Sequence, residues 1–334
     1  MKIPTIHQTD LFHHHADPDD HWDLACQFAL AYMGELDLKG ILLDFPPDLF
    51  EYGDPAIQAI HQLNYITGLA VPAGIGASKE QIIDLQVKEN VNISGVNMVL
   101  KILKESQEPV VIHIVGSCRD VAIAGTMEPE LFREKCKAIY LNAGSGKNGE
   151  QLEYNVGLDP ISYSTIFRFP CPVYWMPCFE EVKAPFEVGK YGTFYKFRQG
   201  EILPYFSDKV QKYFAYALGR VADYKWLTYL EMEKNQTMID HFGKLYRNMW
   251  CTGGFLHAVG KTVTRDGEIL PLSTPGVDSV FAFEPITVSC DKDGITSWSL
   301  TDEPTDRFIF VVKDLDNYEQ AMTKAMRTLL KNLP

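Results

Sequence analysis

Residues 111–124 read Val111-Ile-His-Ile-Val-Gly-Ser-Cys-Arg-Asp-Val-Ala-Ile-Ala124. The stretch starts with a strongly apolar run, which is typical of a strand buried in a sheet. It turns at Gly116 and enters a helical pattern near Val121. Because this order of strand and helix recurs along the first half of the chain, the sequence predicts an α/β fold. We expect a mostly parallel open sheet with helices on both faces and a less regular carboxyl-terminal half.

The expected elements follow from apolar spacing and from Gly and Pro breakers. Strands are expected at 3–9, 38–44, 71–74, 110–115, 138–142, 173–176, 280–290, 295–300 and 308–312. Helices are expected at 22–33, 55–67, 95–106, 121–125, 129–136, 160–167, 210–230, 238–249 and 318–330. Residues 182–200 are rich in aromatic side chains and are expected to form a hairpin or a loop. No linker or internal repeat is evident, so we expect one domain over residues 1–334.

The composition excludes several classes of protein. Of the 334 residues, 46% are hydrophobic and 22% are charged, as in an ordinary globular protein. The net charge of −13 and the lack of a basic stripe argue against a nucleic-acid partner. No apolar run approaches the roughly 20 residues that span a bilayer, and the amino terminus lacks the apolar core of a secretory signal. We therefore expect no membrane partner and a cytoplasmic location, where the seven cysteines would stay reduced.

The unusual segment follows the first expected strand. Between Asp10 and Asp23, fourteen residues contain five aspartates and four histidines. Ligands of open α/β sheets bind beyond the carboxyl ends of the strands, where this segment lies. Like charges at this density repel one another, so a cation or a hydrogen-bond network is expected to hold them.

Three interpretations of the segment remain open from the residues alone. The carboxylates of Asp10, Asp19 and Asp20 would suit a hard cation such as calcium. Histidines suit zinc, and His13-x-His15-x-Asp17 resembles part of a zinc hydrolase motif, although Pro18 stands where that motif has its last histidine. The third interpretation is a solvated acidic loop. Its Asp19 and Asp20 would lie in the first turn of a helix, where the helix dipole stabilises negative charge.

Five elements in chain order resemble the inosine-uridine-preferring nucleoside hydrolase family. The likeness covers most of the chain, with a diverged second half, and implies the fold of that family. The matching elements are Asp10 with Asp19-Asp20, Val71–Gly76, Val111–Ala124, Ala138–Gly144, and Glu153-Tyr-Asn155 followed by Asp159-Pro160.

The resemblance implies a metal site and a catalytic base. Asp10, Asp20 and the backbone carbonyl of Arg119 would hold a calcium ion. Asp10 would also accept a proton from the attacking water.

The resemblance further implies how the substrate is held and released. Asp19, Glu153 and Asn155 would bind the ribose hydroxyls, because carboxylates and amides accept and donate hydrogen bonds in pairs. His257 would protonate the leaving base. The family has an Asp after this His, where this chain has Ala258, so one calcium ligand is missing in this alignment.

The implied function is that of an N-glycosidase, a hydrolase that cleaves the N-glycosidic bond of a ribonucleoside or related ribosyl compound. Two alternatives stay open: a ribosyl-binding member of the fold with weak turnover, and a zinc hydrolase that uses the His13-His15-Asp17 cluster. The substrate would be a small nucleoside-like molecule. By resemblance alone, we expect a homo-oligomer, either a dimer or a tetramer.

Overall fold

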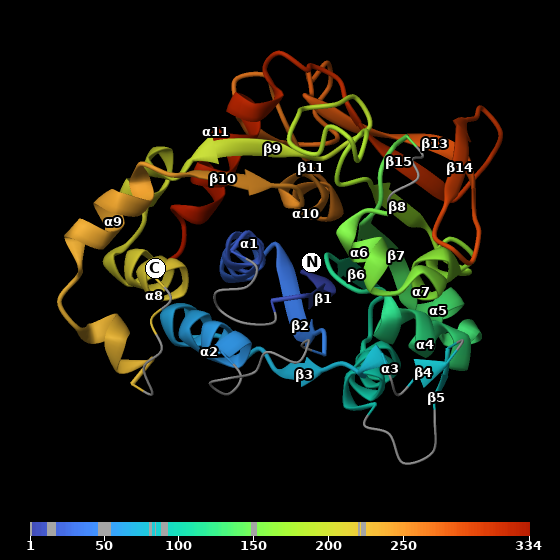
Figure 1. Cartoon of the computed structure of the whole chain (residues 1–334), viewed down its shortest axis with the longest axis horizontal. Coiled ribbons are helices and arrows are strands. Elements are labelled where there is room, and N and C mark those ends of the chain that lie inside the picture. Colours follow the sequence, from blue (N-terminus) through green and yellow to red (C-terminus); the bar gives the residue numbers. More distant parts are fainter. Residues whose placement is uncertain are drawn as a thin grey trace.

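A computed structural model describes residues 2–11, 18–45, 55–79, 82–83, 85–87, 93–147, 152–219, 221 and 225–334. Its main feature is a nine-stranded sheet with the order β14-β13-β15-β8-β7-β6-β1-β2-β3 (Figure 1). In chain order, the strands of this sheet are β1 (Ile3–Thr9), β2 (Leu36–Leu43), β3 (Ala73–Ile75), β6 (Val110–Ile114), β7 (Cys136–Asn142), β8 (Val173–Met176), β13 (Phe281–Cys290), β14 (Thr296–Leu300) and β15 (Arg307–Val312).

The sheet is mostly parallel, as the sequence predicts. All neighbouring pairs from β15 to β3 are parallel. The hairpin of β13 and β14 is antiparallel and adds to the edge of β15. The sheet therefore draws strands from both halves of the chain, and β15 from the carboxyl-terminal half extends the row that begins with β1.

Helices cover both faces of the sheet, and each face has its own hydrophobic core. One face packs against α1 (Asp20–Tyr32), α2 (Pro55–Thr67), α8 (Asp208–Leu218), α10 (Thr252–Ala258) and α11 (Tyr318–Leu330). The other face packs against α3 (Ser94–Glu105), α4 (Arg119–Met127), α5 (Pro129–Lys135) and α7 (Pro160–Ile166). The two-sided arrangement confirms the predicted fold class.

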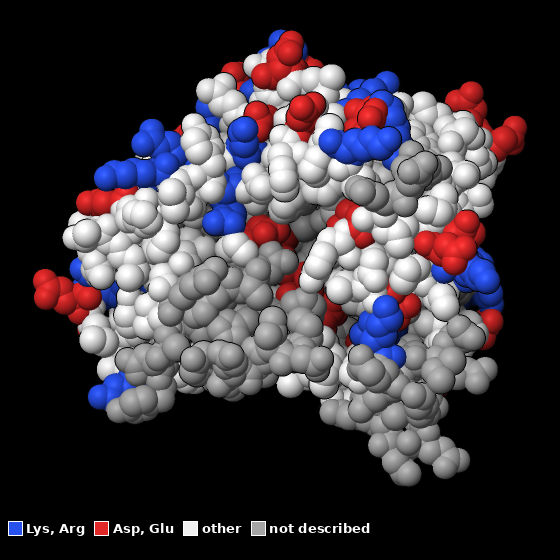
Figure 2. Space-filling view, in the orientation of Figure 1, with Lys and Arg blue, Asp and Glu red and all other residues white. Residues whose placement is uncertain are grey.

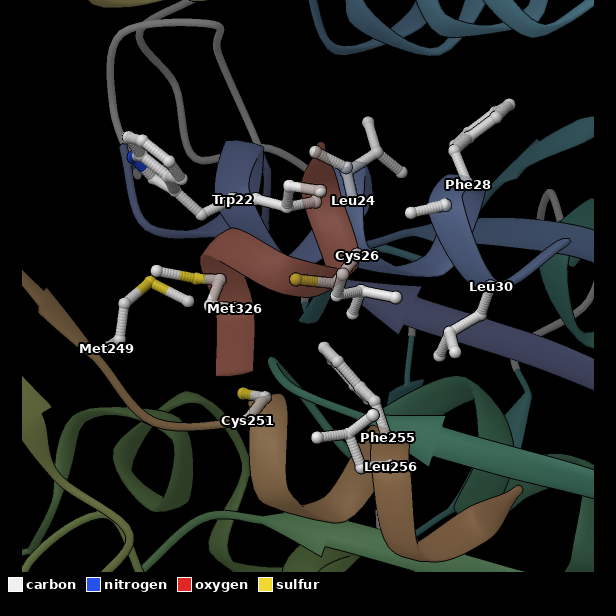
Figure 3. Packing of buried hydrophobic residues seen from close by; sticks show 14 of the residues in the cluster. Trp22, Leu24, Cys26, Phe28, Leu30, Met249, Cys251, Phe255, Leu256 and Met326 are labelled. Carbon is white, nitrogen blue, oxygen red and sulfur yellow. The ribbon is translucent and has the colours of Figure 1, made fainter. Parts of the chain in front are cut away.

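The helix α1 is buried on all sides. Every residue from Asp20 to Ala31 is shielded from solvent. Trp22 packs against the ring of Phe214 with a centroid distance of 4.1 Å. In Figure 3, Cys26 of α1 lies in one core with Phe255 of α10 and Met326 of α11. The first helix is thus enclosed by elements from the carboxyl-terminal half of the chain.

The α3 helix shows how sequence spacing determines packing. Its buried residues Val96, Val99 and Leu103 recur at helical spacing and face the sheet. Two glycines on neighbouring strands make room for this helix. A Cβ atom at Gly40 or Gly74 would come within 3.2 Å and 2.9 Å, respectively, of atoms in the Met98 side chain.

Two helix predictions in the second half are wrong in part. The helix expected at 210–230 ends at Leu218 of α8, and a short 3₁₀ turn covers Thr228–Glu231. The helix expected at 238–249 ends at Gly243 of α9 (Gln236–Gly243). The residues that follow form β10 (Tyr246–Met249), which pairs antiparallel with β9 (Tyr195–Arg198). A distant partner strand outweighs the local helical pattern there.

The remaining elements are short. They are β4 (Ile82–Ile83), β5 (Gln86–Val87), α6 (Tyr154–Leu158), β11 (Lys261–Val263) and β12 (Ile269–Pro271), with 3₁₀ turns at Gln199–Glu201 and Leu203–Tyr205. Among the described helices, none has both the length and the apolar character needed to cross a bilayer.

Candidate functional site

The order of the strands reverses at β1. The chain runs outward from β1 to β2 and β3 on one side, and from β6 to β7 and β8 on the other. Open α/β sheets bind ligands beyond the carboxyl ends of the strands at such a reversal. Asp10 follows β1 and Gly116 follows β6 at this point. In the orientation of Figure 2, acidic side chains line a hollow near the middle of the face.

Asp20 lies at the end of β1, beside the residue that precedes Asp10. Asp10 is 1% exposed and Asp20 is 3% exposed. The hydroxyl of Thr9, the residue before Asp10, donates a hydrogen bond to the Asp20 carboxylate. Asp19 precedes α1, and its main-chain carbonyl accepts from the amide of Trp22 at 2.8 Å. The start of α1 therefore brings a second carboxylate to the end of β1.

Glu153 and Asn155 also lie at this edge, but both hold the backbone. The Glu153 carboxylate accepts from the amides of Gly144 at 2.8 Å and Asn155 at 2.9 Å. The Asn155 amide nitrogen donates to the carbonyls of Val115 at 3.1 Å and Asn142 at 3.2 Å. These bonds join the ends of β6 and β7. The Oδ1 atom of Asn155 has no such backbone bond among the described residues, so it is the better placed atom for a ligand.

The thiol of Cys178 is influenced by three of the predicted carboxylates. Burial raises the pKa of its thiol well above the usual value, and the negative charges of Glu153, Asp19 and Asp10 raise it further. The Cys178 thiol donates to Oδ1 of Asn142 at 3.6 Å. The three carboxylates predicted from distant parts of the sequence therefore share one neighbourhood.

Cys251 contacts the same amide oxygen as Cys178. It precedes α10, and its thiol donates to Oδ1 of Asn142 at 3.2 Å. Burial raises the pKa of Cys251, followed by the charges of Asp23 and Asp20. Sequence reasoning missed both thiols and Asn142. The signal was there, since Asn142 ends β7 and Cys178 lies just beyond β8, at the edge where ligands bind.

The structure places His257 apart from this cluster. It lies six residues beyond Cys251 on α10, about 9 Å along the helix axis. Its Nδ1 atom is hydrogen-bonded to the hydroxyl of Tyr140 at 2.8 Å, and the rings of Tyr174 and Phe283 pack around it. Burial lowers the pKa of His257 to about 4. The neighbouring Ala258 belongs to the hydrophobic core, whereas Cys251, just before α10, contacts Asn142 at the edge of the sheet.

The side chain of Arg119 makes hydrogen bonds to two loops near the start of α4. Its guanidinium donates to the Asp159 carboxylate at 2.9 Å and to the carbonyls of Ala77 and Leu158, both at 3.1 Å. It thereby ties two loops to the start of α4. The Arg119 carbonyl lies in the first turn of that helix, where carbonyls accept from the next turn, so a cation would use its second lone pair.

Asp120 supports the same loop. Its carboxylate accepts from the amide of Ala77 at 3.1 Å. Burial raises the pKa of Asp120 to about 6, although this hydrogen bond lowers it. Together, Arg119 and Asp120 fix the segment after β3 beside the turn that follows β6.

Gly116 has no room for a side chain, which gives a prediction. A Cβ atom there would lie 2.7 Å from the Asp10 amide nitrogen and 2.8 Å from the Asp44 carboxylate. We expect Gly116→Ala to lower the free energy of unfolding by about 1–3 kcal/mol, because backbone atoms cannot yield as a flexible side chain can. Urea denaturation measures the effect. Gly157→Ala is the matched control, since no atom lies within 4 Å of its added Cβ. An equal loss in both variants would contradict the prediction.

The described residues offer few ligands for a metal ion. In the described ranges, no group of three or more His, Cys, Asp or Glu side chains is arranged to hold a metal ion. The calcium set expected from the sequence has only two such side chains, Asp10 and Asp20, with a carbonyl. His13, His15 and Asp17 of the zinc alternative lie outside the described residues.

Two surface cavities lie away from this cluster. One of about 620 Å³ is at the opposite end of the strands, near the start of β1, and includes Lys2 and Lys101. The other, of about 550 Å³, lies between α9 and the end of β9 and includes Arg198 and Lys244. Neither is lined by a predicted site residue, and we place the site by its converging polar groups.

Comparison with known proteins gives related sequences and folds. No family model matches the chain. The chain is 24% identical over 135 residues to the pyrimidine-specific ribonucleoside hydrolase RihA of Enterobacter sp. (strain 638), which covers 34% of this chain and 43% of that protein. The match thus spans less than half of the length of this relative.

Solved structures match over nearly the full length. The purine-preferring ribonucleoside hydrolase from Gardnerella vaginalis aligns with a TM-score of 0.57 and 15% identity, over 98% of this chain and 99% of that one. The type III effector protein XopQ, complexed with adenosine diphosphate ribose, aligns with a TM-score of 0.54 and 13% identity, over 99% and 95%. The likenesses in sequence and fold agree with the order of motifs: the chain has the fold of the nucleoside hydrolases and is similar to them in sequence over about a third of its length.

Proposed function

We propose that this chain hydrolyses the N-glycosidic bond of a ribonucleoside or a related ribosyl compound. The observation that supports it is the convergence of Asp10, Asp20, Glu153 and Asn155 at the reversal point of the sheet. Two of these groups come from the first strand and helix, and two come from a motif more than 130 residues later. Two of the proteins named above, RihA and the protein from Gardnerella vaginalis, are ribonucleoside hydrolases, which favours this reaction for the site.

The donors fit a hard cation. Carboxylate oxygens of Asp10 and Asp20 and the carbonyl of Arg119 are the ligand types that calcium prefers. Two buried carboxylates joined through Thr9 repel each other, and a bound cation would offset that repulsion. Such an ion, when bound, makes water more acidic.

The chain's own residues would then divide the work. Asp10 would accept the proton of the attacking water. Asp19 and Oδ1 of Asn155 would bind ribose hydroxyls, while Glu153 mainly keeps the backbone in place. These bonds would hold the sugar as positive charge develops at its ring.

The leaving base needs a proton as it departs. His257 remains the predicted acid, but with a pKa of about 4 it carries no second proton at neutral pH. It would have to gain one in the substrate complex. A leaving group that departs easily would need less help from an acid.

A second candidate function is binding of a ribosyl ligand with weak turnover. Cys251 favours it, because a neutral thiol at the start of α10 is a poorer ligand for calcium than a carboxylate. The similar fold of an effector bound to adenosine diphosphate ribose points to the same ligand class.

A ribose-release assay separates the candidates. Purified protein, at high concentration with added calcium, is incubated with purine and pyrimidine nucleosides, and free reducing sugar is measured. Release from any nucleoside supports the hydrolase. Calorimetric binding of adenosine diphosphate ribose without release from any nucleoside supports the weak binder and overturns the hydrolase. Stoichiometric zinc by elemental analysis would favour the cluster of His13, His15 and Asp17.

A further inference from the structure

A buried carboxylate outside the predicted site lies at the same edge. Asp44 follows β2 and is 4% exposed. Its amide donates to the carbonyl of Thr9 at 3.0 Å, which continues the pairing of β1 and β2 past their ends. Neither the sequence motifs nor the proposed reaction assigns a role to this residue.

The Asp44 carboxylate is the centre of a closed network. It accepts one hydrogen bond from the side-chain amide of Gln8 and another from the main-chain amide of Ser117, at 2.6 Å. The side-chain oxygen of Gln8, Oε1, accepts from the amide of Gly116 at 3.1 Å. Three hydrogen bonds thus join β1 and β2 to the turn that follows β6.

This network holds the turn against Asp10. Gly116 approaches Asp10 so closely that an added Cβ atom would lie 2.8 Å from the Asp10 Cβ atom. Gln8, on β1, is two residues before Asp10. A shift of the turn would therefore change the distance between the Asp10 carboxylate and the backbone from Gly116 to Arg119.

We propose that Asp44 is a positioning residue, which fixes the Gly116–Ser117 turn beside Asp10 and so sets the geometry of the ion and sugar site. The functional part of this inference rests on the proposed function. The hydrogen-bond network itself does not.

The chemistry of the network requires a carboxylate at position 44. Gln8 uses its oxygen for Gly116, so its NH₂ group must face an acceptor. Ser117 presents a second donor, and only a carboxylate offers two acceptor atoms in that place. An asparagine side chain at this position would present its own NH₂ group to one of these two donors, so Asp44→Asn breaks a bond in either orientation.

The same logic defines a rescue. In the double variant D44N/Q8E, the carboxylate introduced at position 8 accepts from the Gly116 amide and from the side-chain amide introduced at position 44. The oxygen of that introduced amide accepts from Ser117. All three hydrogen bonds are restored, and the negative charge moves from position 44 to position 8 on the neighbouring strand. The single variant Q8E instead sets two carboxylates at hydrogen-bonding distance, which is unfavourable.

The experiment compares wild type, D44N, Q8E and D44N/Q8E. The exchange rates of the Gly116 and Ser117 amides report on the hydrogen bonds of the network. Calcium affinity from titration calorimetry and kcat/KM for ribose release report on the site. In D44N we expect about tenfold faster exchange, and about tenfold losses in calcium affinity and kcat/KM, because a lost hydrogen bond to a charged group weakens the hold on the turn. The double variant should return to within about threefold of wild type in all three measurements.

Three results would overturn the proposal. The first is wild-type exchange in D44N, and the second is a double variant no better than D44N. The third is faster exchange with unchanged calcium affinity and kcat/KM, which would make Asp44 purely structural. The hydrogen-exchange measurement tests the network even if the wild-type protein releases no ribose. Absence of ribose release would overturn the proposed function, and calcium affinity would then be the measurement that reports on the site.

Discussion

Asp10→Asn is expected to lower kcat/KM for ribose release by roughly 10³-fold, within the range for loss of a general base. The substitution keeps the shape of the side chain and removes its charge. Asp10 is buried just after β1, and β1 itself contains no carboxylate that could replace it. The fold should persist, since the change removes one of several crowded negative charges. The rate is measured by reducing-sugar release, and the fold by circular dichroism.

Asp37→Asn is the matched control for this prediction. Asp37 lies near the start of β2, at the opposite end of the strands, and pairs on the surface with Lys39. Its substitution should leave kcat/KM unchanged within about twofold, because exposed ion pairs contribute little. If Asp10→Asn were as active as Asp37→Asn, the role of Asp10 as base would be wrong.

His7 is expected to make the protein less stable in acid. Burial lowers the pKa of His7 from 6.5 to about 3, and neither ring nitrogen has a hydrogen-bond partner among the described residues. Between these two pKa values, the unfolded chain binds a proton that the folded chain does not. The free energy of unfolding should therefore fall as pH falls below 6.5, by about 1.4 kcal/mol per pH unit for this one group.

The variant His7→Leu should remove this dependence. Its stability relative to wild type should improve by about 2 kcal/mol between pH 7 and pH 5, measured by urea denaturation at both values. Ile6→Leu is the control, since Ile6 is a buried neighbour on β1 that carries no titratable group. An equal shift with pH in both variants would show that His7 is not the source.

His113 belongs to the same core and acts in the same direction. It lies opposite His7 in the register of β1 and β6, and its ring stacks on Phe255. Burial lowers its pKa well below the usual value. Its Nδ1 atom is bonded to the side-chain amide of Gln27 at 2.9 Å. The His7 variant therefore isolates one part of the acid sensitivity of wild type.

Local sequence patterns predicted most of the fold. The helices at 55–67 and 318–330 and the strands at 3–9 and 173–176 match the structure to the residue. These segments have regular apolar spacing and clear ends. The segment after Gly243 was misassigned, because β10 exists only through its pairing with β9, which lies some 50 residues earlier.

The candidate site was predictable only where its residues share one short segment or motif. Asp10 and Asp20 are ten positions apart, and Glu153-Tyr-Asn155 is a compact motif. Cys251 was missed because its place depends on where α10 begins. Cys251 lies six residues before His257, and the sequence near Phe255 has no feature that shows where α10 begins.

The enclosure of α1 has a consequence for synthesis of the chain. Its residues leave the ribosome early, yet their packing partners on α10 and α11 are the last helices to be made. At about 5–20 residues per second, roughly 15–60 s separate the first helix from the last. Over that time, the part of α1 that packs against α10 and α11, which includes Cys26, has no permanent cover. A nascent chain of this design would depend on transient burial, or on chaperones, until its final helix arrives.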